Sequence, residues 1–399
     1  MEKAGAKNQP NKDDSSSESD NGGGSLCIRE EDKSLLGVQS LTLVAEPTAE
    51  NRETKVQRWT TAFRERLKRE KDSSGDWITL NDTDYGQNEQ PASSALNTAS
   101  KSFCEDTLRK GVQGLQEEFA NLRQYASENQ TTTAFQSNFN KNRYRDIKCA
   151  DETRVKLKGG PSDYIHASYV NGRKQKFICT QGPLERTVAD FWRMIVQEQV
   201  KMIIMLCETT EKNRKRSAEY WPRTLQQVKK VTNDMSVTNT DVRCVPLKDS
   251  LSIFVTQLIV ARGSNTHPVV HYLWPGWQEH PVPESSVAVL ELVRRAEVPS
   301  LQQPVVVHCA SGVGRTGAFV ALALAFEKLK QNRTLRGPKL LRHLRNQRLH
   351  CIHSELHYVY IHRALLEHFL EENKLKFDKT VAKFLVSYEK QISPYFKKD

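Results

Sequence analysis

The chain has 399 residues, with 59 Lys and Arg against 48 Asp and Glu, and carries a formal net charge of +11. No apolar run follows a basic start and none approaches the roughly 18 residues of a membrane span, so a secreted or membrane-spanning protein is not expected. Eight cysteines are scattered without a Cys-x-x-Cys pair, which favours reduced thiols in a cytoplasmic protein over a disulfide framework or a zinc cage.

Residues 1–105 are predicted to be a low-complexity tail. The opening MEKAGAKNQPNKDDSSSESDNGGGS is polar and nearly free of large apolar side chains. Such a segment cannot bury enough surface to offset the entropy of ordering, so we expect the tail to be largely disordered. Residues 72–105, rich in Ser, Asn and Asp, are predicted to be a linker.

One short basic amphipathic helix is predicted within the tail, at residues 55–71. Val56, Trp59, Phe63 and Leu67 recur there at helical spacing, which gives a narrow apolar stripe on a basic helix. We expect this stripe to dock on the neighbouring domain. Contact with an acidic membrane surface or with nucleic acid is the alternative.

A compact domain is predicted over residues 106–375. It opens with a helical pattern that places apolar residues on one face: Leu108, Val112, Leu115, Phe119 and Leu122. The segments DYIHASYV, KFICTQGP, VKMIIMLC, VTQLIV and PVVVHC are predicted to be strands. The segments ERTVADFWRMIVQEQ, SSVAVLELVRRA, TGAFVALALAFEKLKQ and HSELHYVYIHRALLEHFLEEN are predicted to be helices. This mixture indicates one α/β domain with a twisted mixed β-sheet flanked by helices, and residues 376–399 are predicted to be a C-terminal tail or helix.

The segment PVVVHCASGVGRTGAFVALALAF begins as a buried strand, passes through a turn of small residues and becomes a helix at Thr316. The turn between Cys309 and Arg315 consists of Ala310, Ser311, Gly312, Val313 and Gly314. Glycines let backbone N–H groups converge, and the helix N-terminus adds partial positive charge. We therefore predict that this turn is a nest for a tetrahedral oxyanion.

Cys309 and Arg315 are the residues of this nest that could bind a phosphate and react with it. Arg315 offers a planar fork to two oxygens of a phosphate, and converging amides beside a guanidinium lower a cysteine pKa from about 8.5 into the range of about 3.5 to 7.5. A thiolate aligned with phosphorus can attack it and form a phosphocysteine, and Thr316 could then hydrogen-bond the departing sulfur. A structural buried cysteine is the alternative, but it leaves the small-residue turn unexplained.

With His308 in front, this segment resembles the His-Cys-x5-Arg-Ser/Thr signature of the cysteine-dependent protein tyrosine phosphatases, of the tyrosine-specific, non-receptor type. The likeness extends over about residues 106–372. It implies a single protein tyrosine phosphatase domain that hydrolyses phosphotyrosine in proteins. It implies phosphotyrosine-containing proteins as partners, and neither cofactor, metal nor nucleic acid is expected. The nest lacks the extra lysines expected for an inositol headgroup, which disfavours a lipid phosphatase.

Two further segments match the family. KNRYRDI, residues 141–147, resembles its substrate-recognition loop, which implies that Tyr144 stacks on the substrate ring and sets the depth of the cleft, and that Asp146 clamps the substrate backbone. Ordinary packing at a strand edge is the alternative. In MLCETTEKNRKRSAEYWP, Glu211 and Arg216 stand where family members carry charged residues that steady the cradle arginine and the mobile acid loop.

The acid loop departs from the family pattern Trp-Pro-Asp-His-Gly-Val-Pro, because residues 277–283 read WQEHPVP. The resemblance implies that Glu279 is the general acid, and then the base, since a leaving phenolate of pKa about 10 needs a proton. The extra methylene of glutamate displaces the carboxyl group. Pro281 replaces a glycine in a loop that must close, so we expect altered closure.

Histidines replace expected residues in RNQRLHCIHSELHY, residues 345–358. His353 stands where the family usually has the glutamine that positions water, His357 replaces the next glutamine, and His350 replaces a frequent glycine at the cleft wall. Imidazole can orient or deprotonate water. The spacing of His353 and His357 also suits a metal, but no further ligand set is evident.

Two functions remain open. The first is a working protein tyrosine phosphatase, slow or selective because two loops depart from the family. The second is a catalytically impaired pseudophosphatase that serves as a phosphotyrosine-binding scaffold. Retention of both Cys309 and Arg315 favours the enzyme, because binding needs the arginine more than the sulfur. The changes in both loops favour the scaffold.

Overall fold

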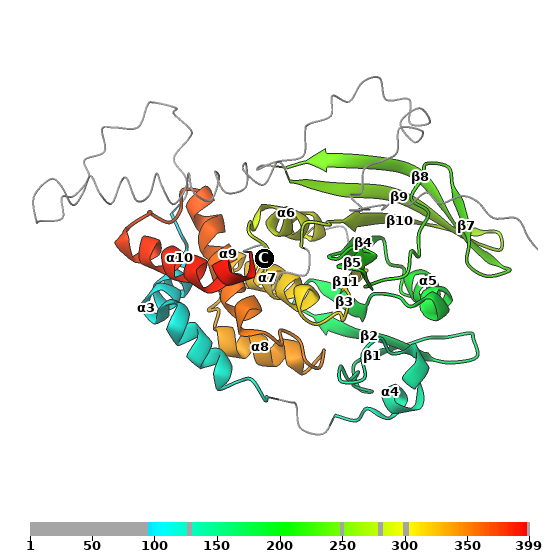
Figure 1. The fold of residues 1–399 in the computed structure, drawn as a ribbon, viewed down its shortest axis with the longest axis horizontal. Helices are drawn as coiled ribbons and strands as arrows, with labels where there is room; N and C mark the ends of the chain where they lie inside the picture. Colours follow the sequence, from blue (N-terminus) through cyan, green and yellow to red (C-terminus); the bar gives the residue numbers. More distant parts are fainter. Residues whose placement is uncertain (1–94, 126–129, 248–250, 278–281, 298–302, 397–399) are drawn as a thin grey trace, which may run out of the picture. The chain divides into compact units, whose positions relative to one another are not determined.

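The computed structural model describes residues 95–125, 130–247, 251–277, 282–297 and 303–396, all of which belong to the unit Val44–Asp399 (Figure 1). The tail before residue 95 and the predicted helix at 55–71 lie outside the described residues. In the part of the chain that the structure describes, no helix combines the length and apolar character that crossing a membrane would require.

The helices are α3 (Thr98–Ala120), α4 (Thr133–Ser137), α5 (Val188–Gln197), α6 (Val287–Ala296), α7 (Arg315–Lys330), α8 (Gly337–Arg345), α9 (Glu355–Glu371) and α10 (Lys379–Ile392), with 3-10 turns η1 (Phe139–Lys141), η2 (Glu185–Thr187) and η4 (Ser393–Tyr395). The strands are β1 (Arg154–Lys156), β2 (Tyr164–Asn171), β3 (Lys176–Gln181), β4 (Met202–Met205), β5 (Thr210–Glu211), β6 (Arg214–Lys215), β7 (Val228–Lys230), β8 (Met235–Pro246), β9 (Ser252–Arg262), β10 (Asn265–Leu273) and β11 (Val305–Cys309).

The main sheet is mixed, as predicted, with the strand order β1-β2-β3-β11-β4-β10-β9-β8-β7. The last strand in the sequence, β11, lies between β3 and β4 and runs parallel to both. Towards its edges the sheet continues with antiparallel pairs such as β2 with β3 and β8 with β9. The carboxyl end of β11, where Cys309 lies, is therefore held by a strand on each side.

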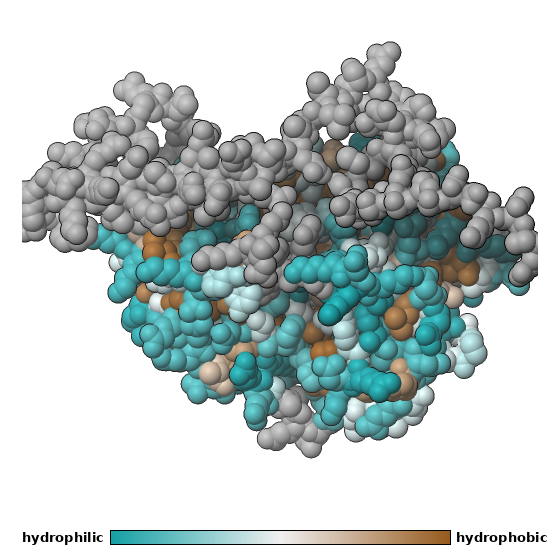
Figure 2. Space-filling view, viewed as in Figure 1, coloured by the Kyte–Doolittle hydropathy of each residue, from teal (hydrophilic) through white to brown (hydrophobic). Residues whose placement is uncertain are grey.

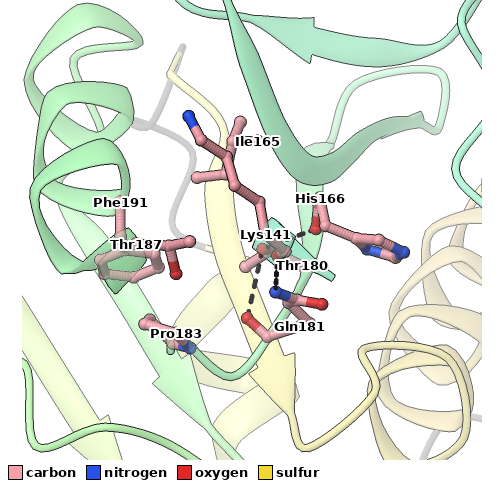
Figure 3. Close-up of a pocket in the computed structure, with 8 residues that line it drawn as sticks. All are labelled: Lys141, Ile165, His166, Thr180, Gln181, Pro183, Thr187 and Phe191. Atoms are coloured by element: carbon pink, nitrogen blue, oxygen red, sulfur yellow. Dashed lines mark hydrogen bonds between the residues drawn. The ribbon is translucent and has the colours of Figure 1, made fainter. Parts of the chain in front are cut away.

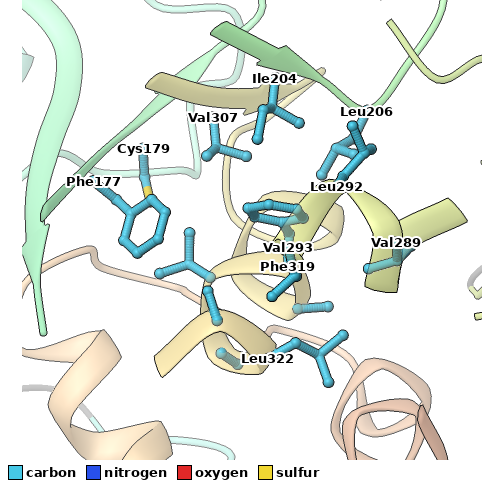
Figure 4. Close-up of a cluster of buried hydrophobic side chains, with 14 of the residues drawn as sticks. Phe177, Cys179, Ile204, Leu206, Val289, Leu292, Val293, Val307, Phe319 and Leu322 are labelled. Carbon is cyan, nitrogen blue, oxygen red and sulfur yellow. The ribbon is translucent and has the colours of Figure 1, made fainter. Parts of the chain in front are cut away.

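Alternation along β11 explains how both faces of the sheet are covered. Val307 is buried in the apolar cluster with Ile204 of β4 and Phe319 of α7 (Figure 4). The next residue, His308, points to the other face, where its ring meets Phe191 of α5 edge-on with centroids 6.1 Å apart. Successive side chains of a strand point to opposite faces, and Figure 1 accordingly shows α5 and α7 on opposite sides of the central strands.

The first described helix corrects one predicted boundary. Helix α3 begins at Thr98, inside the segment assigned to a linker, because the Asn97 side chain caps it by accepting a hydrogen bond from the Ser100 N–H. Phe103 and Cys104 are already buried in the core. The helix is interrupted at Gly111, whose φ is 64°.

Six strands were not predicted, namely β1, β5, β6, β7, β8 and β10, and one predicted element takes a definite form. The residues of β8 and β10 contain Asn, Thr, Asp, His and Pro, so they lack the continuous apolar runs that marked the inner strands. At the C-terminal end, α10 is a helix with Val381, Phe384 and Tyr388 buried. Of the two alternatives predicted for residues 376–399, a tail or a helix, the helix is therefore correct for residues 379–392.

Candidate active site

The turn after β11 forms a cradle around the sulfur of Cys309. Gly312 has a φ of +70°, and its N–H donates to Cys309 Sγ at 3.3 Å. A Cβ at position 312 would lie 2.1 Å from the carbonyl oxygen of Thr180. Only glycine fits both the left-handed backbone and the close approach to β3, so the small residues of the turn are a geometric requirement of the cradle.

A buried arginine holds the outer wall of this cradle. The side chain of Arg348 is fully buried and donates to the carbonyl oxygens of Gly312 and Ser311, each at 3.2 Å. It also bonds Ser168 Oγ at 3.2 Å and His166 Nδ1 at 3.0 Å. By accepting these bonds the turn carbonyls face away from the cradle, which leaves its N–H groups for an anion. Arg348 was not predicted to be a site residue, because a single arginine in a basic segment carries no distinctive signal.

The cradle makes Cys309 easier to deprotonate than an ordinary cysteine. Burial alone raises the pKa of this thiol, but the Arg315 guanidinium and hydrogen bonds from Thr316 and Gly312 lower it by more. The net result is a Cys309 pKa below its ordinary value. The other buried thiols behave differently, since burial raises the pKa of Cys351 to about 12. Cys309 is thus set apart from its neighbours as a nucleophile.

Arg315 is held in place by a buried carboxylate. Its Nη1 and Nη2 donate to the two oxygens of Glu211, at 2.5 and 2.8 Å, and Nη1 also donates to the carbonyl oxygen of Leu206. Arg216 Nε lies 3.5 Å from the same carboxylate. The bidentate pair fixes the plane of the guanidinium beside Cys309. Glu211 and Arg216 therefore lie where the family resemblance implied that they steady this arginine.

The segment 141–147 lies beside the cradle and is tied to it through Gln181. The Gln181 side chain accepts from the Arg143 N–H and donates to the carbonyl oxygen of Lys141, both at 2.8 Å, next to a small pocket (Figure 3). The Arg143 side chain donates to the carbonyl oxygens of Gly182 and Pro183. These bonds anchor the loop on the residues that follow β3, which is directly next to β11.

Tyr144 and Asp146 come from this anchored loop. Tyr144 is half-buried, and its hydroxyl lies 3.5 Å from Arg216 Nη1. Asp146 is exposed, and its charge opposes the effect of burial, which lowers the pKa of both His350 and His353. The structure therefore brings the segment 141–147 and the histidine segment close enough for their charges to interact.

The predicted acid loop is only partly described. Trp277 is fully buried, with ring centroids 6.0 Å from Trp274, 5.6 Å from Tyr360 and 5.9 Å from His357. Val282 is fully buried as well. Residues 278–281, which include Glu279 and Pro281, lie outside the described residues. The role of Glu279 stays a prediction.

The histidine segment packs directly against the last glycine of the cradle. A Cβ at Gly314 would lie 2.8 Å from His353 Cε1 and 3.2 Å from His357 Cε1. The rings of His353 and His357 are 5.6 Å apart. His353 and His357, predicted from the resemblance to replace two glutamines, are thus adjacent to the nest.

His357 and His350 have unusual environments. Burial, with His353 and Arg315, lowers the pKa of His357 to about 3, so its ring is neutral, and neither ring nitrogen has a hydrogen-bond partner among the described residues. His350 has a φ of 62°, a left-handed conformation that favours glycine. No group of three or more His, Cys, Asp or Glu side chains within the described ranges could hold a metal ion.

Comparisons with known proteins agree on one family. A family model described as protein-tyrosine phosphatase matches residues 138–367. Human tyrosine-protein phosphatase non-receptor type 9 is 33% identical over 283 residues, which cover 64% of this chain and 46% of that protein. Human receptor-type tyrosine-protein phosphatase zeta is 33% identical over 284 residues, 65% of this chain and 12% of that protein. Tyrosine-protein phosphatase 69D of Drosophila melanogaster is 35% identical over 237 residues, 57% of this chain and 16% of that protein. The chain thus spans less than half the length of each of these relatives.

Proposed function

The chain belongs to the protein-tyrosine phosphatase family, and on that premise we propose that it hydrolyses phosphotyrosine in proteins through a phosphocysteine intermediate. The observation that carries this proposal is the Cys309 sulfur, which accepts the Gly312 N–H at 3.3 Å and has a lowered pKa beside Arg315. A protein that only binds phosphotyrosine needs the anion nest and the guanidinium. It has no need of an activated thiolate.

In the first step, Cys309 Sγ attacks phosphorus while the cradle amides of residues 310–314 and the fork of Arg315 hold the phosphate oxygens. The P–S bond forms and the bond from phosphorus to the tyrosine oxygen breaks. Glu279 donates a proton to the leaving phenolate, which would otherwise leave poorly because its pKa is about 10. Thr316 stabilises the sulfur as a thiolate.

In the second step, water attacks phosphorus, the P–S bond breaks and the thiolate returns. The Glu279 carboxylate accepts a proton from this water, and the imidazole of His353, which lies against Gly314, orients it. Desolvation and Arg345 lower the pKa of His353 against the opposing effect of Asp146. The ring is therefore neutral at pH 7, so it can accept a hydrogen bond from water.

Specificity for tyrosine follows from the depth of the cleft. Tyr144 is half-buried on the anchored loop 141–147 and is proposed to stack on the substrate ring, while the exposed Asp146 binds the backbone of the substrate. A shorter phosphoserine would not reach Cys309 from the rim that Tyr144 defines. A reducing, cytoplasmic setting is part of the proposal, and it is supported by the described cysteines, all of which are free.

The second candidate is a pseudophosphatase that retains phosphotyrosine. The observation that favours it is His357, a buried imidazole beside the cradle whose two nitrogens have no hydrogen-bond partner among the described residues. It stands where the resemblance leads one to expect an amide.

Hydrolysis of a phosphotyrosine peptide decides between the two. It should be followed with burst-phase resolution in the wild type and in Cys309→Ser, Glu279→Gln and Glu279→Asp. We expect wild-type turnover, none with Cys309→Ser, and a loss of about 10²-fold or more with Glu279→Gln. If no protein turns over while the wild type and Cys309→Ser hold the peptide equally, the scaffold is the correct function.

A further inference from the structure

The stretch between Lys328 and Ser354 contains eight Lys and Arg and no acidic residue. Two of these cations are structural, since Arg345 and Arg348 are buried and donate to backbone carbonyl oxygens. A third, Lys330, forms an ion pair with Glu297. The remaining cations lie on or near α8, and the proposed reaction uses none of them.

The exposed members of this group form a continuous surface with a neighbouring turn. We define the basic face as six exposed side chains: Arg333, Arg336, Lys339 and Arg342 on and before α8, and Arg173 and Lys174 in the turn between β2 and β3. The turn is fastened to α8, because His343 Nε2 donates to the carbonyl oxygen of Asn171 at 2.8 Å. It is fastened to α7 as well, since the N–H of Lys174 donates to Glu327 at 2.7 Å. Figure 2 shows a mainly hydrophilic surface over α3 and α8.

The charges of the basic face are not neutralised within the described part of the chain. None of its six cations makes an ion pair with a described carboxylate, whereas other exposed arginines, such as Arg243 and Arg262, pair with a nearby aspartate. Glu327 of α7 accepts the backbone N–H of Lys174. Like charges even oppose one another here: burial, and then Arg333 and Lys339, lower the pKa of Lys328.

The basic face leads to the rim of the cleft. Arg342 lies over the ring of Tyr125 at 5.7 Å, and the Tyr125 hydroxyl donates to Asn346 Oδ1 at 2.9 Å. The chain then continues from Asn346 to His350 and His353. The charge of Asp146, in the loop 141–147, affects the pKa of both histidines. Helix α8, with nine residues, is about 13 Å long, and about four residues of extended chain would span it.

We propose that the basic face binds an acidic segment of the phosphotyrosine protein whose phosphate occupies the cradle. The inference rests on the proposed function and adds a substrate class to it: proteins with several Asp or Glu residues beyond the immediate neighbours of the phosphotyrosine. Ion pairs between the basic face and an acidic segment lie away from the reacting phosphate. They therefore act mainly by lowering KM and by speeding association of the substrate with the protein.

A protein segment fits this face better than a lipid surface does. The large apolar side chains that are exposed among the described residues are Phe139, Val228, Phe377 and Tyr395. None of them lies on α8 or on the β2–β3 turn, so the face offers no apolar group for insertion between lipids. A basic face close to the active site can contribute to substrate binding only if the molecule that it binds also reaches the active site.

The test compares two peptides with the same phosphotyrosine core, one with five Asp or Glu and one with five Ser placed about five to nine residues from the phosphotyrosine. KM and kcat are measured at several salt concentrations. The wild type should have a KM about tenfold lower for the acidic peptide at low salt, as three exposed ion pairs of ordinary strength would produce. The difference should vanish at high salt because the pairs are screened.

The first variant carries Arg336→Glu, Lys339→Glu and Arg342→Glu. A second variant carries Gln at the same three positions, which removes the positive charges without adding negative ones, in case the first variant misfolds. The matched control carries Lys201→Glu, Lys230→Glu and Lys383→Glu, three exposed or largely exposed lysines elsewhere. Only the first two variants should lose the preference for the acidic peptide, with kcat on the neutral peptide unchanged. Equal KM values for both peptides in the wild type, or equal loss in the control, would overturn the proposal.

Two further measurements, peptide binding to Cys309→Ser and vesicle binding, distinguish the remaining outcomes. If the wild type hydrolyses neither peptide, the proposed function fails, and binding of both peptides to Cys309→Ser, measured by fluorescence anisotropy, still tests the basic face. Vesicles with about 30% anionic lipid test the lipid alternative. If vesicle binding depends on the three α8 cations and the two peptides have equal KM values, the ligand of the basic face is a membrane surface and not an acidic protein segment.

Discussion

The cradle and the histidine segment pack against each other at Gly314, but they differ in how their polar groups are satisfied. In the cradle, the Arg315 guanidinium is held by Glu211 and Leu206, and Arg348 bonds the carbonyl oxygens of the turn. In the histidine segment, both ring nitrogens of His357 lack partners among the described residues. The half that binds phosphate is preorganised, and the half that handles water is not.

This difference suggests that the two chemical steps are unequally supported. Formation of the phosphocysteine depends on the cradle, whose groups are fixed before substrate arrives. Its hydrolysis depends on a water held near His353 and on a loop whose residues depart from the family pattern. We therefore expect the second step to limit turnover, and each of the following changes tests one side of this contrast.

Arg315→Lys should have the largest effect. Lysine keeps the charge but loses the fork that pairs with both oxygens of Glu211 and with the phosphate. Loss of one preorganised group that stabilises charge typically costs about 10²- to 10³-fold, so we expect kcat/KM to fall by about 10³-fold in steady-state assays. Lys330→Arg, at an exposed ion pair on the same helix, is the control. A loss of less than tenfold for Arg315→Lys would mean that the cradle is not preorganised by this residue.

His353→Gln should have an intermediate effect, confined to the second step. Only the neutral ring can accept a hydrogen bond from the attacking water, and the pKa of His353 is lowered from its ordinary value near 6.5. Wild-type dephosphorylation should therefore stay constant above that value and fall as pH drops through the lowered pKa. The variant should lose this part of the pH dependence and turn over about tenfold more slowly.

The burst amplitude of His353→Gln should remain that of the wild type, because phosphocysteine formation does not involve His353. His343→Gln, on the exposed side of α8, is the matched control. Faster turnover in His353→Gln than in the wild type would show that imidazole is an impediment here, as the pseudophosphatase alternative requires.

His350→Gly should have the smallest effect, on stability. The φ of 62° at His350 costs a residue with a Cβ about 1 to 2 kcal/mol, partly offset by the greater freedom of glycine when unfolded. We expect the free energy of unfolding, from urea titration, to rise by about 0.5 kcal/mol. Gly312→Ala is the opposite change at a similar φ, and it should destabilise, because its Cβ would meet Thr180. If both changes destabilise, the strain at His350 is compensated by contacts of its ring.

Much of the fold could be predicted from local pattern. The inner strands and the helices α5, α6, α7 and α9 carry apolar residues at regular spacing, and periodicity reports burial directly. Strands β8 and β10 escaped prediction because their residues are mostly polar, and a strand of this kind is defined by its neighbours in the sheet. Helix α8 was missed because it is short and its three leucines are interspersed with four basic residues.

The candidate site divides in the same way. The sequence by itself determined the strand, the small-residue turn and the helix that bring Cys309 and Arg315 together, because these residues are close in the chain and glycine is needed at a left-handed turn. Resemblance extended this to Tyr144, Asp146, Glu211 and His353.

Only the tertiary structure decided which distant groups complete the cradle. Arg348, which was not predicted, bonds the carbonyl oxygens of Gly312 and Ser311 across 36 and 37 residues. The unpartnered His357 and the basic face likewise emerge only once α8, α9 and the β2–β3 turn are placed. Local periodicity records which side of an element is buried, whereas a hydrogen bond or a shared surface between distant segments leaves no trace in the spacing of either segment.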